Sequence, residues 1–293
     1  MAAVINHRWV RTAFPWKEFK QVCEGGLGLV RPYVSRSLPD PAGWKFGSAW
    51  APSYYAFGRM RALLAISEGR RLKRRRVLEV AAGDGSLCAA LATDGCEVVA
   101  NDLREEPLRA AITDFTNRDR IQVRCGNLFD LQPDQLGKFD LVIACEILEH
   151  VAHTVEFLTQ LRRFIAPGGH ALVTTPNGAF FRNKLPTWSQ VSDFKALEAH
   201  QFKPDADGHL FLITPSEMQL LAGRAGFTGS EISVWGAPFL TGNADLARFS
   251  NRTLSPIWTT AEAAVQYLPT GIRTRICTAM SAVLSTEPDT PRA

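Results

Sequence analysis

The chain has 293 residues, of which 46% are hydrophobic, and its formal net charge is +4 at pH 7. This much apolar material can form a full core, which excludes a globally disordered protein. The charge is too small to indicate nucleic-acid binding by itself. The six cysteines are scattered without a CxxC pair, which disfavours a zinc ribbon or a thioredoxin-like redox site. We interpret most of them as reduced core residues, as in a cytoplasmic protein.

Three regions differ in composition. Residues 1–70 are rich in Trp, Tyr, Pro and Gly, and we predict that they form a lid or cap. Residues 71–293 are predicted to form the main domain, with a lid insertion at 178–210 and a C-terminal cap insertion at 240–273. No secretory signal is visible, and no stretch of 18 or more apolar residues occurs. We therefore expect a cytoplasmic protein without a transmembrane segment.

Short β-like runs alternate with helical patterns between residues 76 and 177. The predicted strands are 76–80, 97–102, 121–127, 139–146 and 170–177, and the predicted helices are 86–95, 107–115 and 147–166. This alternation indicates βαβ units with right-handed crossovers and a parallel sheet that has helices on both faces. The Pro-Gly-Gly sequence at 167–169 is expected to stop the long helix.

The C-terminal part adds one helix with a clear start and two strands. Thr214 is a predicted N-cap, Pro215 stands at the first helical position, and Glu217 completes a capping box. Residues 231–235 suggest a sixth strand, and 275–285 fit either an amphipathic helix or a last strand, of which we favour the strand. The predicted fold is an α/β, Rossmann-like doubly wound sheet of seven strands, the last one antiparallel, with an added lid.

The turn after the first predicted strand consists of small residues. Ligands of open α/β sheets bind outside the carboxyl ends of the strands. At that place the chain reads EVAAGDGS (79–86), and Ala81, Gly83 and Gly85 permit a tight turn and a close approach of backbone to a ligand. A dinucleotide site requires GxGxxG, but the corresponding frame here reads AxGxxS. Asp84 also adds a negative charge where a pyrophosphate would lie, whereas the sulfonium cofactor S-adenosylmethionine (SAM) carries no phosphate.

Polar residues end the next three strands. Asp102 follows the second strand, where a carboxylate can accept both hydroxyls of a ribose. Asn127 ends the third strand, where it can read an adenine edge. Cys145 and Glu146 end the fourth. This arrangement suits a nucleoside cofactor.

On these residues the chain resembles the class I SAM-dependent methyltransferases. Their glycine motif E/DxGxGxG corresponds to Glu79-Val80-Ala81-Ala82-Gly83-Asp84-Gly85, with Ala81 in place of the first glycine. The resemblance continues through FDLVIACEILEHV, the PGG turn, TTPN and the helix ending in AGF, over roughly residues 60–235. The chain is similar in particular to the O-methyltransferases of ubiquinone and menaquinone biosynthesis. We expect the Ala81 methyl to narrow the turn without abolishing it.

The resemblance implies SAM as the cofactor and a set of residues that contact it. Some members use an arginine twenty residues before the first glycine position to meet the cofactor's carboxylate, and Arg61 stands there. The alternative for Arg61 is a solvated helix residue. The predicted cofactor-binding residues are Arg61, Glu79, Ala81, Gly83, Gly85, Asp102, Leu103, Asn127, Leu128 and Cys145.

The stretch ACEILEHVAH (144–153) contains four titratable residues at helical spacing. Glu146, Glu149, His150 and His153 are spaced i, i+3, i+4 and i+7, so on one helix they would share a face. A structural interpretation makes Glu149 and His150 hydrogen-bonded braces of the strand–helix turn. A second makes His150 or His209 a metal-free general base, because histidine is easily tuned near neutral pH.

The third interpretation is a divalent metal site, which the resemblance implies. In the ubiquinone-type enzymes, and in related 2′-O-methyltransferases that act on small-RNA 3′ ends, an ExxEH motif here supplies metal ligands. Glu146, Glu149 and His150 match that motif, and the RNA enzymes add a histidine about sixty residues on, where His209 stands. Two carboxylates and an imidazole fit Mg²⁺ only moderately, and they fit Mn²⁺, Fe²⁺ or Zn²⁺ as well as they fit Mg²⁺. All three interpretations stay open on the sequence.

The sequence therefore predicts a SAM-dependent methyltransferase, with Glu149, His150 and His209 as candidate catalytic residues. We expect O-methylation of a small hydroxylated acceptor that is aromatic, lipophilic or sugar-like, because the predicted lid segments are rich in aromatic residues. The alternatives are a metal-dependent RNA-end 2′-O-methyltransferase, a nicotinamide-dependent oxidoreductase and a non-catalytic SAM-binding protein. Nucleic acid is disfavoured as a partner, since the basic run at 70–76 directly precedes the first strand and fits a solvated sheet edge. The sequence does not indicate an oligomeric state.

Overall fold

The computed structural model describes residues 65, 68–69, 72–83, 85–113, 115, 117–201, 208–236 and 264–287. The chain divides into two compact units. One unit comprises His7–Asn127 and Gly236–Pro269, and the other comprises Met1–Asn6, Leu128–Trp235 and Thr270–Ala293. Most of the predicted lid at 1–70, including Arg61, and the part of the predicted cap before residue 264 lie outside the described residues.

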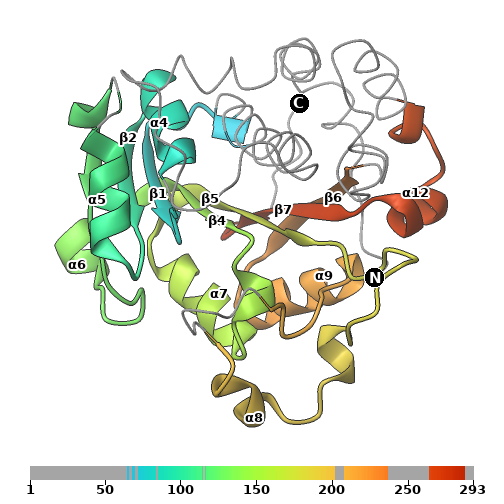
Figure 1. The fold of residues 1–293 in the computed structure, drawn as a ribbon. Helices are drawn as coiled ribbons and strands as arrows, with labels where there is room; N and C mark the ends of the chain where they lie inside the picture. Colours follow the sequence, from blue (N-terminus) through green and yellow to red (C-terminus); the bar gives the residue numbers. More distant parts are fainter. Residues whose placement is uncertain are drawn as a thin grey trace, which may run out of the picture. The chain divides into compact units, whose positions relative to one another are not determined.

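The described residues form seven strands in the order β3-β2-β1-β4-β5-β7-β6 (Figure 1). Their bounds are β1 Arg76–Val80, β2 Glu97–Asn101, β3 Ile121–Val123, β4 Phe139–Cys145, β5 Ile165–Pro176, β6 Gly229–Trp235 and β7 Ala279–Ser285. The pairs β1–β2, β2–β3 and β4–β5 are parallel, whereas β7 runs antiparallel to both β5 and β6. The predicted Rossmann-like α/β fold with an antiparallel last strand is confirmed.

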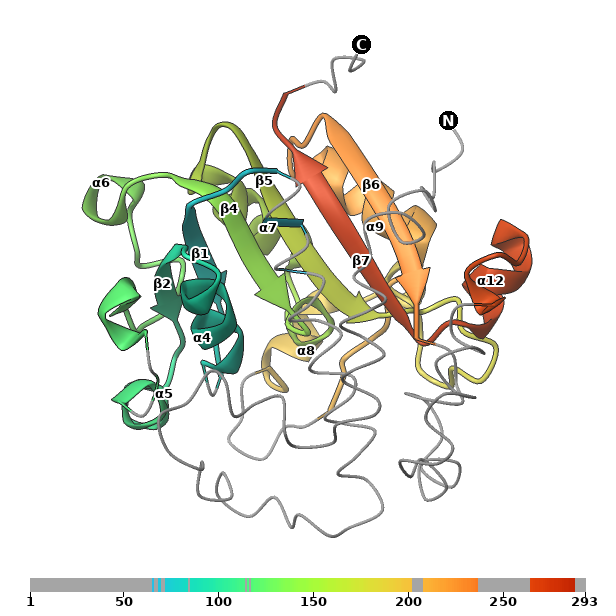
Figure 2. The ribbon, with the colours of Figure 1, turned by 90° about the horizontal axis from the view of Figure 1, so that it is seen from above.

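Helices follow the strands in alternation along the chain. Among the described residues, the α-helices are α4 Ser86–Thr93, α5 Glu105–Thr113, α6 Pro133–Leu136, α7 Thr154–Arg163, α8 Phe194–Glu198, α9 Pro215–Arg224 and α12 Thr270–Ile276. The 3₁₀ turns are η3 Arg118–Arg120, η4 Leu148–His150 and η5 Trp188–Gln190. Helices α7 and α9 contact each other and pack on β5, β6 and β7, side by side on one face of these strands (Figures 1 and 2). Among the described residues, no helix combines the length and apolar character that crossing a membrane requires.

The core of the second unit is formed by β4 and β5. Residues 141–144 and 171–173 are fully buried, as a continuous apolar run predicts for a strand inside a sheet. Helix α7 adds Phe157, Leu158 and Leu161 from its buried side. Each such side chain stabilises the fold by about 1.5–3 kcal/mol relative to an exposed position. The two strands are therefore a rigid base for the residues at their carboxyl ends.

The predicted helix over 147–166 is wrong in two respects. Its first part is the 3₁₀ turn η4, after which Val151 is extended, and α7 begins only at Thr154. Its end lies at Arg163, and the Pro-Gly-Gly sequence belongs to β5. Gly169 is needed there for a close strand approach, because a Cβ atom would lie 2.8 Å from the Ala166 carbonyl oxygen and 3.0 Å from that of Phe139.

The other predicted elements differ from the structure only at their ends. The third strand is shorter than predicted, and the helix predicted at 107–115 begins two residues earlier. In the segment 275–285, the first two residues belong to α12 and the strand begins at Ala279. The capping box of α9 is confirmed, since Thr214 accepts from the backbone N–H of Glu217 and the Glu217 side chain accepts from that of Thr214.

Candidate active site

The turn after β1 has the left-handed backbone that its small residues predict. Ala81 has φ 57°, Gly83 φ 57° and Gly85 φ 69°. Gly85 is also enclosed, because a Cβ atom would lie 3.2 Å from the side chains of Leu108 and Phe115. For Ala81 the left-handed conformation costs about 1–2 kcal/mol. The turn therefore tolerates the missing glycine at a cost in backbone strain.

Asp102 connects this turn to the loop after β2. Its Oδ2 accepts a hydrogen bond of 2.9 Å from the Gly83 N–H, and its Oδ1 accepts one of 3.0 Å from the Arg104 N–H. The side chain is nearly buried, and the Asp102 carbonyl oxygen accepts from the Gly126 N–H at 2.9 Å. The carboxylate thus orders the protein's own glycine turn. Sequence reasoning missed this duty, and the predicted ribose contact stays a prediction.

The remaining described cofactor candidates lie in β1 and β4 or in the loops that follow β2 and β3. The Glu79 carboxylate is buried and accepts from the Cys88 thiol at 2.7 Å. Leu103 and Asn127 are exposed, Leu128 is buried, and Cys145 is half-buried as the last residue of β4. Leu103 is therefore accessible from solvent, whereas Leu128 belongs to the core.

Glu146, the first residue of the ExxEH motif, binds a neighbouring strand. It has φ 52°, an unusual value for a non-glycine residue, and its backbone N–H donates to the Thr174 carbonyl at 2.8 Å. Its carboxylate Oε1 accepts from the Thr174 hydroxyl at 2.9 Å. The described structure therefore does not bring Glu146 into the group formed by Glu149, His150 and His209.

His153 is likewise outside that group. It is the N-cap residue of α7, and its Nε2 lies 2.6 Å from the Glu198 Oε1 at the end of α8. The prediction that four residues of this stretch share one helix face is therefore wrong. The reason is local, because the chain is a 3₁₀ turn through His150 and leaves helical geometry at Val151.

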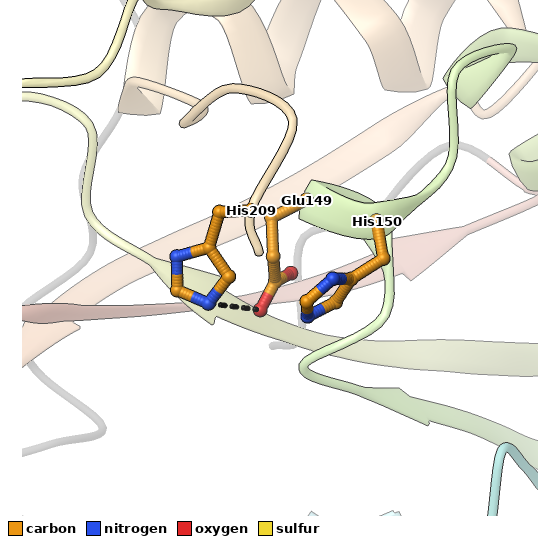
Figure 3. Close-up of side chains that lie close together, drawn as sticks. All are labelled: Glu149, His150 and His209. Atoms are coloured by element: carbon orange, nitrogen blue, oxygen red, sulfur yellow. Dashed lines mark ion pairs between the residues drawn. The ribbon is translucent and has the colours of Figure 1, made fainter. Parts of the chain in front are cut away.

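Glu149, His150 and His209 do come together (Figure 3). One potential ligand atom from each lies within 4.8 Å of the others. The Glu149 Oε1 is 3.9 Å from the His209 Nε2, and the two imidazole rings meet edge to face with centroids 5.0 Å apart. Figure 3 shows the Glu149 carboxylate between the two rings. The predicted pairing of the LEH turn with a histidine 59 residues further on is thus present.

Three contacts hold this arrangement. The fully buried Glu149 carboxylate accepts at Oε2 from the Thr175 hydroxyl, at 2.9 Å. The Glu149 carbonyl accepts from the Leu210 N–H at 2.8 Å, and the Gly208 carbonyl lies 3.2 Å from the His150 Nδ1. Because a carbonyl only accepts, the His150 Nδ1 carries the proton and donates in this contact. Segment 208–210 is therefore bound to the turn that it faces.

The electrostatics favour a neutral imidazole at His209. Burial, and then the nearness of His150, lower the pKa of the His209 imidazole. A neutral histidine is the form that binds a metal ion or accepts a proton. The arrangement at neutral pH is therefore a buried carboxylate beside a neutral His209.

This donor set fits a divalent cation. One carboxylate and two imidazoles suit Mn²⁺, Fe²⁺, Co²⁺ or Zn²⁺ better than Mg²⁺, which prefers oxygen. Ligand atoms at about 2.1 Å from one ion are at most about 4.2 Å apart, so a movement of less than about 1 Å would let these residues share an ion. In the part of the chain that the structure describes, no second group of three such ligands is found.

Comparisons with known proteins find similarity to methyltransferases. The chain is 32% identical over 113 residues to a ubiquinone biosynthesis O-methyltransferase of Dechloromonas aromatica (strain RCB), covering 38% of this chain and 49% of the relative. It is 29% identical over 164 residues to the enzyme of the same name from Acinetobacter baumannii (strain AYE), covering 55% and 67%. The alignments thus span about half to two thirds of these relatives' lengths.

A solved structure and a family model extend the comparison. The structure of the citrinin polyketide synthase CMeT domain has a TM-score of 0.51 at 12% identity, covering 95% of this chain and 66% of that one. At that identity the likeness supports the fold alone. A family model described as "Methyltransferase domain" matches residues 53–232, which is more than half of the chain. With the glycine turn and its acidic partner in place, the chain therefore belongs to the SAM-dependent methyltransferase family.

Proposed function

We propose that this protein transfers the methyl group of SAM to a hydroxyl of a small acceptor, at a divalent cation site made by Glu149, His150 and His209. The observation that carries the proposal is the convergence of one carboxylate and two imidazoles from segments far apart in the chain. The names of the two bacterial relatives support an oxygen acceptor. The aromatic residues of segment 178–201 support an aromatic or lipophilic acceptor, with a sugar-like one as the alternative.

The chemistry is an in-line displacement at the methyl carbon. The acceptor oxygen forms a bond to the methyl group as the bond to sulfur breaks, the electron pair stays on sulfur, and S-adenosylhomocysteine leaves. The sulfonium is already activated, so the protein mainly supplies alignment. The acceptor hydroxyl must still lose its proton. A bound divalent cation lowers the pKa of such a hydroxyl.

The residues of the group divide this work. As ligands of a metal ion, Glu149 would contribute one negative charge and the two imidazoles none, so together they would balance only half of a divalent charge. The His150 ring is oriented through its Nδ1 contact with Gly208, and the backbone bond between Glu149 and Leu210 holds His209 beside it. Because its pKa is lowered, His209 is an uncharged imidazole at neutral pH, which is the form that can accept a proton from the acceptor hydroxyl.

The test is chelation followed by metal return. After exhaustive chelation, methyl transfer to an acceptor panel of polyphenols, quinone precursors, sugars and an RNA oligonucleotide should vanish. It should return with one of Mg²⁺, Mn²⁺, Fe²⁺ or Zn²⁺. Full activity after chelation, with no metal detected in the purified protein, would contradict the cation site. In that event a His150→Ala variant that binds SAM and folds, but does not turn over, would establish metal-free base catalysis.

Cofactor identity is tested separately by calorimetric titration. SAM should bind and NAD(H) should not, because the turn lacks the GxGxxG pattern.

The described cysteines form no disulfide, which supports the cytoplasmic location predicted from the sequence. That location stays a proposal.

A further inference from the structure

Two successive threonines of β5 each bind one glutamate of the ExxEH motif. Thr174 and Thr175 are both fully buried, and adjacent residues of a strand point to opposite faces of the sheet. The Thr174 hydroxyl donates to the Glu146 Oε1 at 2.9 Å. The Thr175 hydroxyl donates to the Glu149 Oε2, also at 2.9 Å. The two bonds are alike in length and chemistry, but only Glu149 belongs to the group with His150 and His209.

The Thr175 hydroxyl binds one oxygen of the Glu149 carboxylate, and the other oxygen lies near His209. Oε2 accepts from Thr175, whereas Oε1 is the atom 3.9 Å from the His209 Nε2. A glutamate side chain rotates about several bonds, and a donor at one oxygen restricts both the position and the plane of the carboxylate. Groups that orient a metal ligand in this way typically contribute substantially to metal affinity.

The donor is itself fixed. Thr175 is paired with Met280 in the antiparallel ladder between β5 and β7, and its neighbour Thr174 is paired with Cys145 of β4. A hydroxyl on a buried inner strand moves little, so it can hold the carboxylate in one orientation before a ligand arrives. Pre-orientation of this kind is the condition for a precise binding site.

We propose that Thr175 is a positioning residue of the cation site and acts through Glu149, whereas Thr174 has no such duty. This inference rests on the proposed function, because it assumes that Glu149, His150 and His209 bind a divalent cation. It assigns different roles to two neighbouring threonines with the same burial and the same kind of hydrogen bond, so Thr174 is a matched control.

The experiment titrates Mn²⁺ into the full-length, metal-free protein by calorimetry, for wild type, Thr175→Val, Thr175→Ser and Thr174→Val. Thr175→Val should raise the Kd for Mn²⁺ by about 10–100-fold, the range typical of losing such an outer partner. Thr175→Ser keeps the hydroxyl and should restore an affinity close to that of wild type. Thr174→Val should also stay close to wild type. SAM affinity and the thermal unfolding temperature, measured in parallel, should be the same in Thr175→Val and Thr174→Val.

A second readout uses Co²⁺, whose visible absorption reports its ligand geometry. The spectrum should change in Thr175→Val and not in Thr174→Val. If Thr175→Val does not fold, Thr175→Ala compared with Thr175→Ser tests the same hydroxyl. An unchanged Kd without the Thr175 hydroxyl, or an equal loss in Thr174→Val, would overturn this inference alone. Failure of the wild-type protein to bind Mn²⁺ would overturn the proposed cation site as well.

Discussion

The turn after β1 and the group at the end of β4 are built in different ways. The turn and its partner Asp102 lie within 79–102, and backbone N–H groups and left-handed residues make the arrangement. The group at β4 draws on three separate segments, namely η4, Thr175 of β5 and the loop at 208–210. The first is a local backbone device that a short motif can encode. The second exists only where distant segments meet.

The difference extends to what each region requires of its surroundings. The turn needs conformational freedom, which glycine supplies at Gly83 and Gly85. The group needs burial and fixed donors, because the Glu149 carboxylate is completely enclosed and a buried charge is costly unless other groups bind it. Substitutions should therefore affect SAM affinity in the first region and cation affinity in the second.

The largest expected effect is that of His209→Ala. This change removes a proposed ligand, so the loss of Mn²⁺ affinity should exceed the about 10–100-fold typical of an outer partner. SAM affinity should stay near that of wild type, and both constants can be measured by calorimetry. His153→Ala is the matched control, because His153 pairs with Glu198 outside the group. Equal effects of the two variants would contradict the assignment.

Asp102→Ala should give the reverse pattern. We expect SAM binding to weaken by about 1–3 kcal/mol, because the substitution removes a charged acceptor from the turn and from the predicted ribose site. Mn²⁺ affinity should be retained. Arg104→Ala is the control, since its exposed side chain is only loosely paired with Asp102 at 3.9 Å and should contribute little. Unchanged SAM affinity in a folded Asp102→Ala protein would refute the ribose role.

Glu217→Gln tests a structural carboxylate outside both regions. Burial by itself would raise the pKa of Glu217, but hydrogen bonds from Ser189 and Thr214 outweigh it, and the pKa is lowered. A lowered folded-state pKa gives stability that is present above the usual value of 4.5 and lost as the pH falls through the folded-state pKa.

The free energy of unfolding of the Glu217→Gln protein at pH 7 should therefore be about 1 kcal/mol lower than that of wild type. This difference from wild type should become smaller below the folded-state pKa of Glu217. Urea unfolding at pH 7 and at such an acidic pH can measure it. A deficit that is the same at both would mean that the charge of Glu217 does not contribute.

The smallest effect is expected for Ala81→Gly. Glycine removes the left-handed strain of about 1–2 kcal/mol but adds about 0.5–1 kcal/mol of backbone entropy to the unfolded chain. Stability should therefore rise by at most about 1.5 kcal/mol, and SAM affinity should be preserved. Thermal unfolding and a SAM titration measure both, and a collapse in SAM affinity would show that the glycine motif has been placed in the wrong register.

Much of the fold could be predicted because its signals are local. Apolar runs marked the strands, and the pattern Thr214-Pro215-Ser216-Glu217 predicted the start of α9 to the residue. The helix over 147–166 was predicted wrongly because its apolar spacing is helical, whereas the backbone leaves helical geometry at Val151. The place of Pro-Gly-Gly inside β5 also depends on a close approach to Phe139 that no local pattern contains.

The sequence by itself determined the alternation of strands and helices and the small-residue turn with Asp102, and it suggested the pairing of the LEH motif with His209 as one of three interpretations. These follow from periodicity, from backbone preferences and from a resemblance carried by short motifs. Only the tertiary structure decided that Glu146 turns to Thr174, that His153 turns to Glu198, and that Thr175 holds Glu149. The physical reason is that a side chain's partner depends on which distant segment the folded backbone brings within hydrogen-bond distance, and spacing along the chain does not specify it.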